Sequence, residues 1–451
     1  MSRNTDLTVG SPSKVLLKFS LPLLISVAFQ QFYNIADSII AGKLIENGEN
    51  ALAAIGASYP VTMLFIAVAT GVSAGCSVVA SNLFGSHNFT RLKTSVTTSF
   101  IFVGILSLIL TVTGAIACEP IITALNTPQN IYSDSCIYLN IYILGLPFLF
   151  FYNVSNGIFA SFGDSKTPLY LLIMSSVGNI ILDLVTVVCF KMGISGIAWS
   201  TFVAQGFSAV LAFILLIVRL HRLECSEKPA LFSGNMLKKI LSVAIPSVLQ
   251  QSFVSVGNLF IQGIINDFGS SAIAGYSAAI KLNTFLVTCI ATMSNGLSGF
   301  TAQNIGAGKH DRIPKGFKSS VIISLLISTC TTLLYLLLGN ELIGVFMESP
   351  DGKAISIGYD FLLIVSPFYF TVTTKLNCDA IFKGSGAMTL FMITTFSDLV
   401  LRVVLAFIFS GTLGMGLIGV WWSWPIGWGV SAAISAIFYI SGVWKKHIKS
   451  F

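Results

Sequence analysis

The sequence predicts an all-α integral membrane protein with twelve transmembrane helices arranged as two six-helix lobes. Three observations predict this class. First, 54% of the 451 residues are hydrophobic and only 10% are charged, whereas soluble domains carry about 25% charged residues. Second, apolar runs such as 101–117 and 319–338 approach or exceed the ~18 residues that cross a hydrocarbon core. Third, the two halves of the chain repeat each other.

The apolar runs define the transmembrane elements in chain order. We predict spans at 15–40, 54–83, 94–117, 136–161, 168–190, 194–218, 240–265, 274–304, 319–338, 356–382, 388–410 and 416–443. Most Lys and Arg residues lie in the segments on one side of these spans, and the opposite loops hold only Lys43, Lys191 and Lys353. By the positive-inside rule, this bias predicts that both termini lie in the cytoplasm. The expected location is the plasma (inner) membrane.

The domain organisation follows from the same spans. We predict an N-lobe at 1–220, a cytoplasmic linker at 221–239, and a C-lobe with a short basic tail at 240–451. Each lobe contains an even number of spans, so both lobes enter the membrane from the same side. This arrangement predicts a parallel duplication, an architecture common among transporters, with the substrate site near the middle of the membrane.

The internal repeat has a spacing of about 220 residues. Residues 73–91 and 294–312 align without a gap, and 194–200 aligns with 417–423. Pro22 aligns with Pro246 near the start of each half. The matched pairs in the first alignment are Ser73/Ser294, Gly75/Gly296, Ser77/Ser298, Gly85/Gly306 and Arg91/Arg312.

Polar side chains recur at helical spacing within the N-lobe spans, where they are energetically costly. They are Gln30, Tyr33, Asn34 and Asp37 in the first span, Asn153 and Asn156 in the fourth, Ser176, Asn179 and Asp183 in the fifth, and Thr201 in the sixth. Two carboxylates, an amide and a hydroxyl supply the oxygen ligands that a small hard cation prefers. A carboxyl group beside a second one in a cavity of low dielectric constant also holds a proton readily. The pattern therefore predicts a site for Na⁺ or for H⁺.

The alternative for these residues is a hydrogen-bond network that joins membrane helices. This alternative explains Asp37 and Asp183 less well, because no Lys or Arg lies mid-span in the same lobe to neutralise them. In the C-lobe, Lys375 and Asp379, and Asp398 and Arg402, have the i,i+4 spacing of ion pairs, and Lys281 has no local partner. Both structural and functional roles are consistent with these C-lobe charges. The residues that correspond to Asp37, Asn179 and Asp183 in the repeat are Ile261, Arg402 and Ala406.

Several segments together resemble one transporter family. They are LPLLISVAFQQFYNIADSIIAGKL (21–44), ALAAIGAS (51–58), FASFGDSKTP (159–168), NIILD (179–183) and AQNIGAG (302–308). Through these segments and the duplicated plan, the chain resembles the multidrug and toxic compound extrusion (MATE) transporters over essentially its full length. The resemblance implies two lobes arranged as a V, a central cavity, and alternating access driven by inward movement of Na⁺ or H⁺.

The resemblance also implies roles for individual residues. Asp37, Asn179, Asp183 and Thr201 match the N-lobe cation site of prokaryotic members, and Pro22 matches the proline at which the first helix bends. The expected substrate contacts are Gln30, Tyr33, Asn34, Asn153, Asn156 and Ser176. Some bacterial members carry acidic cation-site residues in the C-lobe, and we find no clear equivalents on spans seven and ten.

The expected function is therefore secondary active antiport, in which cationic or lipophilic drugs and metabolites leave the cell in exchange for Na⁺ or H⁺. The alternative is a lipid-linked oligosaccharide flippase, which would favour a more cationic cavity, and a channel or receptor would not account for two unpaired carboxylates. We expect no enzymatic activity, no cofactor, and no metal other than Na⁺ at the cation site. The expected partners are small amphipathic substrates and the lipid bilayer, without nucleic acid, and the expected functional form is a monomer.

Overall fold

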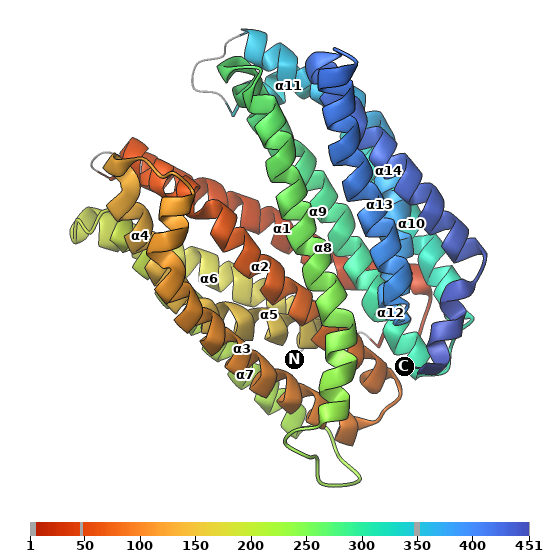
Figure 1. Ribbon diagram of the computed structural model, residues 1–451. Coiled ribbons are helices and arrows are strands. Elements are labelled where there is room, and N and C mark those ends of the chain that lie inside the picture. Colours follow the sequence, from red (N-terminus) through yellow and green to blue (C-terminus); the bar gives the residue numbers. More distant parts are fainter. Residues whose placement is uncertain (1–5, 46–47, 347–351, 451) are drawn as a thin grey trace. The chain divides into compact units, whose positions relative to one another are not determined.

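The computed structural model describes residues 6–45, 48–346 and 352–450 (Figure 1). The described chain consists of helices and their connections, and no strand occurs in these ranges. The N-terminal half contains α1 (Pro12–Lys43), α2 (Gly48–Gly85), α3 (Phe89–Ala124), α4 (Gln129–Leu144), α5 (Leu146–Ser161), α6 (Lys166–Leu184), η1 (Val185–Cys189) and α7 (Ile194–His221). The C-terminal half contains α8 (Gly234–Asn266), α9 (Ser270–Gly306), α10 (Arg312–Gly344), α11 (Gly352–Val365), η2 (Ser366–Phe368), α12 (Tyr369–Gly384), α13 (Met388–Phe407), η3 (Ile408–Thr412), α14 (Gly416–Ile440) and η4 (Val443–Ser450).

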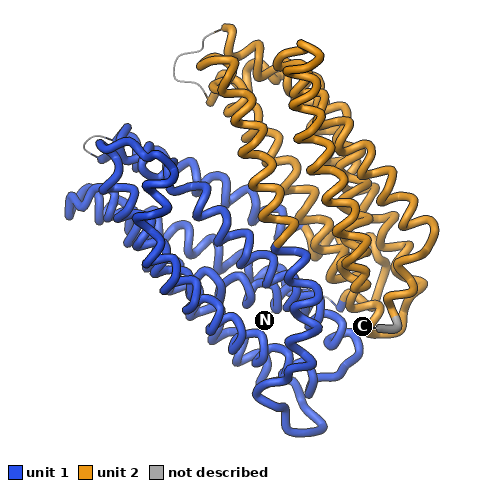
Figure 2. The backbone as a smooth tube through the Cα atoms, in the orientation of Figure 1, with its two compact units in different colours: residues 1–6, 21–248 blue, residues 7–20, 249–451 orange. Residues whose placement is uncertain are grey.

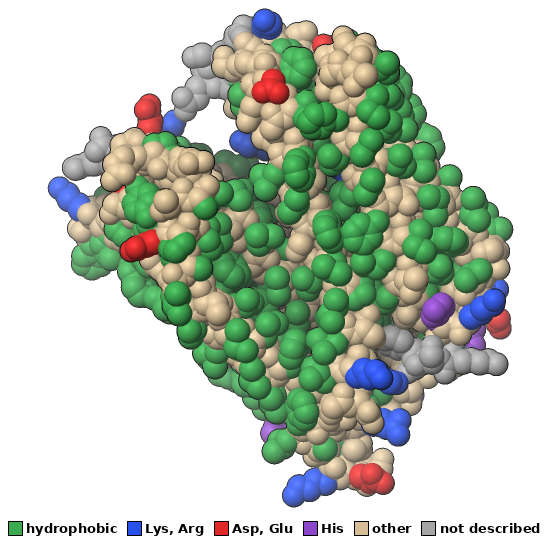
Figure 3. Space-filling view, in the orientation of Figure 1, with side chains coloured by type: hydrophobic (Ala, Val, Ile, Leu, Met, Phe, Trp, Pro, Cys, Tyr) green, Lys and Arg blue, Asp and Glu red, His purple; other side chains and the backbone are tan. Residues whose placement is uncertain are grey.

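The predicted all-α membrane class is confirmed. Within the described ranges, 11 helical segments are long and apolar enough to cross a membrane, and α4 with α5 supplies a twelfth if this bent pair is one span. The axis turns by 48° between α4 and α5, where Gly145 and Pro147 interrupt the helix. On the face shown in Figure 3, charged side chains lie mainly near the ends of the helices, and apolar side chains cover most of the length between them.

The chain divides into two compact units, which Figure 2 distinguishes by colour. Unit 1 contains residues 1–6 and 21–248, and unit 2 contains residues 7–20 and 249–451. Consequently, the first nine residues of α1 belong to unit 2, while the first part of α8, up to Val248, belongs to unit 1. The predicted lobes place the start of α1 in the N-lobe (1–220) and the start of α8 in the C-lobe (240–451). The lobes therefore describe the sequence repeat and remain a prediction, because the bounds of the two compact units differ from theirs.

Two glycines that are equivalent in the repeat explain this division. A Cβ atom on Gly75 of α2 would lie 2.8 Å from the Cβ of Ala244 in α8. A Cβ atom on Gly296 of α9 would lie 2.9 Å from the Oγ of Ser20 in α1. Glycine at both positions lets the helices pack closely. The start of α8, in the C-terminal half of the sequence, therefore packs against a glycine of the N-terminal half. The start of α1, in the N-terminal half, packs against a glycine of the C-terminal half.

The repeat is also visible in local backbone structure. The π-helical turns η1 and η3 follow α6 and α13 directly, and each occupies five residues at a spacing of 223. Gly193 and Gly416, which are 223 residues apart, have φ values of 61° and 59°. These positive angles favour glycine and let each chain turn sharply into the next helix. The same sequence signals have therefore produced the same local structure twice.

Candidate functional site

The polar residues of α1, α6 and α7 converge within unit 1. With the Asn179 amide oriented so that its nitrogen faces the acidic groups, Nδ2 donates to Asp183 Oδ2 at 3.1 Å and to Asp37 Oδ1 at 3.2 Å. In this orientation Oδ1 accepts from the backbone N–H of Thr201 at 3.1 Å. Asn179 thus joins two carboxylates to α7. The spacing along α1 and α6 predicted this stripe, and the structure brings together all four residues that were expected to bind the cation.

The two carboxyl groups accept from the same amide nitrogen and lie close enough to interact electrostatically. Asp183 is fully buried, and its Oδ1 has no hydrogen-bond partner in the described structure. In the described ranges, neither Asp37 nor Asp183 forms an ion pair with Lys or Arg. Two adjacent carboxylates without a basic partner repel each other strongly in a medium of low dielectric constant. The arrangement therefore favours a proton shared between them or a small cation bound to their oxygens.

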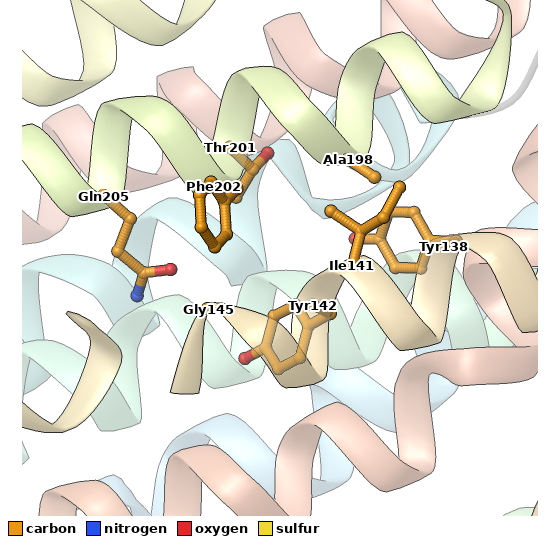
Figure 4. Close-up of a pocket in the computed structure, with 8 residues that line it drawn as sticks. All are labelled: Tyr138, Ile141, Tyr142, Gly145, Ala198, Thr201, Phe202 and Gln205. Carbon is orange, nitrogen blue, oxygen red and sulfur yellow. The ribbon is translucent and has the colours of Figure 1, made fainter. Parts of the chain in front are cut away.

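Tyrosine side chains surround the carboxyl pair. Tyr33 of α1 and Tyr138 of α4 are close enough to interact electrostatically with both carboxylates. Figure 4 shows a small pocket beside this group, between α4 and α7. Its lining residues are Tyr138, Ile141, Tyr142, Gly145, Ala198, Thr201, Phe202 and Gln205. Thr201 belongs both to the pocket and to the polar cluster, so the pocket adjoins the candidate cation site.

Other predicted contact residues lie apart from this cluster. Gln30 and Asn34 are exposed on α1. The Asn153 amide donates to the Leu149 carbonyl of its own helix at 2.8 Å, and its backbone carbonyl accepts from Ser73 Oγ at 2.6 Å. Asn156 Oδ1 is buried without a hydrogen-bond partner in the described structure. Ser176 is buried, and like these residues it makes no described hydrogen bond to the carboxyl pair. Their predicted role in substrate binding remains a prediction.

Sequence analysis identified Thr201 but missed the other residues that α4 and α7 contribute to the pocket. Tyr138 and Tyr142 are one helical turn apart, and Thr201 and Gln205 have the same spacing on α7. This spacing is the same signal that identified the stripes on α1 and α6. The spacing could therefore have identified Tyr138 and Tyr142 through their hydroxyl groups.

Unit 2 contains the i,i+4 ion pairs expected from the sequence. Lys375 Nζ lies 2.8 Å from Asp379 Oδ2, and Arg402 Nη2 lies 3.2 Å from Asp398 Oδ2. All four side chains are less than 10% exposed. Lys281 Nζ lies 5.6 Å from the centroid of the Phe346 ring, which satisfies part of its charge through a cation–π contact.

The chain matches a family model twice. The family is MatE, and the matched segments are residues 22–185 and 246–408. The two segments together cover more than half of the chain, and their starts are Pro22 and Pro246, the prolines that align in the repeat. The double match independently supports the internal duplication.

Curated relatives agree with this family. The chain is 26% identical over 436 residues to "Probable multidrug resistance protein YoeA" of Bacillus subtilis, covering 95% of this chain and 93% of the relative. It is 29% identical over 334 residues to a protein named "FAD transporter" from Shewanella oneidensis, covering 72% of this chain and 71% of the relative.

Solved structures share the fold. A crystal structure of MATE in the bent conformation matches with a TM-score of 0.90 at 23% identity, over 100% of both chains. A transporter of the MOP superfamily from Pyrococcus furiosus matches with a TM-score of 0.90 at 23% identity, over 100% of this chain and 99% of that one. At this identity the likeness establishes the fold alone.

Proposed function

This chain belongs to the MatE family, and from that premise we propose that it is an antiporter that exports cationic or lipophilic drugs and metabolites in exchange for Na⁺ or H⁺. Relatives of the chain are named as multidrug resistance proteins, and its membrane-spanning fold agrees with such a role. The observation that carries the coupling proposal is the Asp37–Asn179–Asp183 cluster, in which two carboxylates share one amide donor and lack a basic partner in the described structure.

The cluster can link ion binding to a change in α1. Asp37 lies on α1, whereas Asn179 and Asp183 lie on α6 and Thr201 lies on α7. A cation or proton bound between the carboxylates removes their repulsion and draws these helices together. When the ion leaves, the repulsion returns. A ligand shifts such an equilibrium only by its differential affinity for the two states, and the unneutralised carboxyl pair supplies that difference.

Pro22 supplies a place where α1 can bend. It removes a backbone donor inside the helix and crowds the preceding turn. Its side chain is buried. It is the second residue of α1 that belongs to unit 1, which begins at Leu21 in this helix. Structures that share this fold include one named as MATE in the straight conformation and one named as MATE in the bent conformation. We propose that Pro22 is the hinge of the corresponding movement here.

We propose that the protein lies in a plasma membrane with both termini in the cytoplasm, a topology supported by the basic residues on one side of the spans. We also propose that one chain is sufficient for transport, because the cation cluster and the adjoining pocket are formed by helices of a single unit. The substrate contacts are Gln30, Tyr33, Asn34, Asn153, Asn156 and Ser176, together with the pocket beside Thr201.

The test is efflux from proteoliposomes under a sodium gradient alone and then under a proton gradient alone. The panel contains a lipophilic cation, a neutral amphiphile and FAD, the last because of the name of the Shewanella relative. We expect one of the two gradients to drive export of the lipophilic cation. Equal export in the absence of any gradient would contradict antiport, and export of FAD alone would replace the proposed substrate class.

A further inference from the structure

The proposed mechanism leaves the buried charges of unit 2 without a role. Their position becomes informative when the two units are compared residue by residue. The register is fixed by structure, because η1 and η3 are 223 residues apart, as are the positive-φ glycines Gly193 and Gly416. The helices that flank these turns are α6 with α7 in unit 1 and α13 with α14 in unit 2. In unit 1, these flanking helices carry most of the candidate cation site.

The same offset gives the unit 2 counterparts of that site. Asn179 corresponds to Arg402, and Asp183 corresponds to Ala406. Thr201 corresponds to Trp424. On the first helix of each half, the aligned prolines make Ile261 the counterpart of Asp37. Where unit 1 has two carboxylates and an amide, the corresponding positions of unit 2 have two apolar residues and a guanidinium.

The contacts in unit 2 reproduce the helix pairing of unit 1. In unit 1, Asn179 of α6 contacts Thr201 of α7. In unit 2, the guanidinium carbon of Arg402 lies 4.5 Å from the centroid of a ring of Trp424. Such a cation–π contact is stronger when water is excluded, and the Arg402 side chain is only 6% exposed. A positive charge is thus held at the place where unit 1 would hold its ion.

The counterparts of the two coupling carboxylates are apolar and completely packed. Ile261 is 1% exposed and Ala406 is 0% exposed, and both belong to the same apolar cluster as Trp424. The negative charge that balances Arg402 comes instead from Asp398, one turn earlier on α13. Asp398 corresponds to Ser175 in unit 1, so this carboxylate occurs only in the half that also carries the guanidinium.

The charge balance of the two sites differs accordingly. In unit 2, Arg402 is paired with Asp398 and Lys375 is paired with Asp379, so each carboxylate has a basic partner, and Lys383 lies near enough to interact electrostatically with the second pair. In unit 1, Asp37 and Asp183 have no basic partner in the described structure, and two negative charges remain. A site with an uncompensated carboxylate pair can load and release a cation, whereas a site that carries its own fixed cation cannot.

We infer that Arg402 is a tethered cation: its guanidinium takes, in unit 2, the place that Na⁺ or H⁺ takes in unit 1. A guanidinium is always charged and cannot dissociate from the chain. Unit 2 therefore remains permanently in a form equivalent to the ion-loaded state, and unit 1 alone determines how many ions move per cycle. This inference rests on the proposed cation site in unit 1, and it adds that the C-terminal counterpart of that site binds no mobile ion.

Removal of the tethered charge provides the test. Arg402→Ala removes the ion-pair partner of Asp398, whereas Asp379 keeps Lys375 and the nearby Lys383, so a mobile cation should bind beside Asp398. Asp398 interacts with Arg402 on its own helix and with Lys375 on α12, and Tyr276 of α9 faces Arg402. Asp379, Lys383 and Cys378, also on α12, interact with Lys375. The variant is made in an Asp37→Asn/Asp183→Asn background, in which the unit 1 site cannot respond to ions. The matched control is Arg402→Lys, which keeps a tethered charge.

The measurement is the melting temperature of the purified full-length protein in NaCl or in choline chloride of equal ionic strength, at two pH values on either side of neutrality. We expect Na⁺ or the lower pH to raise the Tm of the Arg402→Ala variant by about 2 °C or more, because a ligand that binds only the folded state stabilises it. The background and the Arg402→Lys control should not respond. Arg402→Gln serves as the second variant if Arg402→Ala does not fold.

Equal responses in Arg402→Ala and Arg402→Lys, or no response in a folded Arg402→Ala or Arg402→Gln variant, would overturn the tethered-cation inference. The proposed function has a separate criterion, since it requires the wild-type protein to respond to the coupling ion and the Asp37→Asn/Asp183→Asn background to lose that response. Failure of the unit 1 assignment can therefore be distinguished from failure of the inference about Arg402.

Discussion

Asp37 and Asp183 form no ion pair with Lys or Arg in the residues that the structure describes. They come from different helices, and the Asn179 amide is their common donor. Each carboxylate accepts one hydrogen bond from this amide, which does not neutralise its negative charge. Burying an ionised side chain in a membrane interior costs several kcal/mol. These side chains are therefore expected to be occupied by an ion or proton for part of the transport cycle.

Replacing either carboxylate tests this expectation. Asp37→Asn or Asp183→Asn keeps the size of the side chain but removes the charge that attracts the ion, and we expect gradient-driven efflux to fall by about 100-fold, which corresponds to about 2.7 kcal/mol of lost coupling. Efflux from proteoliposomes gives the result. The control is Glu119→Gln, which removes an exposed carboxylate at the end of α3. Wild-type rates for Asp37→Asn under both gradients would show that the carboxyl pair does not couple transport.

At the residue scale, spacing in the sequence predicted the stripes on α1 and α6, because residues three and four apart share a helix face. It did not predict that Asn179 would bridge the two carboxylates, since that contact depends on how α1 and α6 are rotated about their axes. The contribution of Tyr138 could not be predicted for the same reason: α4 must pack against α7 before its hydroxyl can approach the site.

At the element scale, close contacts between helices decide which segments form one unit. Gly75 shows the effect clearly, because an added Cβ would lie 2.7 Å from the Ile240 carbonyl oxygen and 2.8 Å from the Cβ of Ala244. Backbone atoms cannot move away as a flexible side chain can. The contact therefore requires glycine at this position in α2.

We expect Gly75→Ala to lower stability by about 1–3 kcal/mol, the range typical of overpacking in a closely packed interior. A thermal melt of the purified protein measures the change. Gly56 provides the matched control on the same helix, because a Cβ there would meet no atom within 4 Å. Gly56→Ala should leave stability unchanged or slightly increased. Equal melting temperatures for the two variants would mean that α8 does not pack on α2 as described.

The Asp398–Arg402 pair makes a second prediction at this scale. Asp398→Asn should destabilise the protein by about 3 kcal/mol, because it leaves a buried guanidinium without its closest counter-charge. The double variant with Arg402→Gln should recover part of that loss. A double-mutant cycle of thermal melts measures the coupling energy, and a value near zero would show that the two side chains do not stabilise each other despite their 3.2 Å separation.

The sequence predicted the helices well at this scale, because long apolar runs have few alternatives in a membrane. It did not predict the 48° turn between α4 and α5 within the single span expected at 136–161. It also did not predict the break at 366–368 between α11 and α12. Pro147 and Pro367 mark both sites, but a proline can kink a helix or end it, and tertiary packing decides between these outcomes.

At the scale of the whole molecule, α1 runs from unit 2 into the cation site of unit 1 by way of Pro22. We expect Pro22→Ala to weaken transport while ion binding survives, because the substitution restores a helix donor and favours a straight α1. Ion binding is measured by the ion-dependent shift in melting temperature, and transport by proteoliposome efflux. The matched control is Pro120→Ala, which changes an exposed proline inside α3.

Distances between spin labels at Ile39 of α1 and Ile181 of α6, both exposed positions of unit 1, report the movement directly in a background without native cysteines. The wild type should show two populations whose ratio changes with pH or Na⁺, and Pro22→Ala should show one. A distance distribution in the wild type that is the same under all conditions would exclude bending of α1 as the coupling step.

The exchange of helix starts between the units also constrains how the chain is made. Residues 7–20 leave the ribosome long before residue 296, yet Gly296 is the glycine that packs against Ser20. During synthesis, unit 1 can be completed once residue 248 has entered the membrane, whereas the first segment of α1 must wait for α9. Biogenesis is therefore not a sequence of two independent insertions. A ribosome that stalls within the connection at 222–233, between α7 and α8, would leave a nascent chain in which the start of α1 still lacks its neighbour.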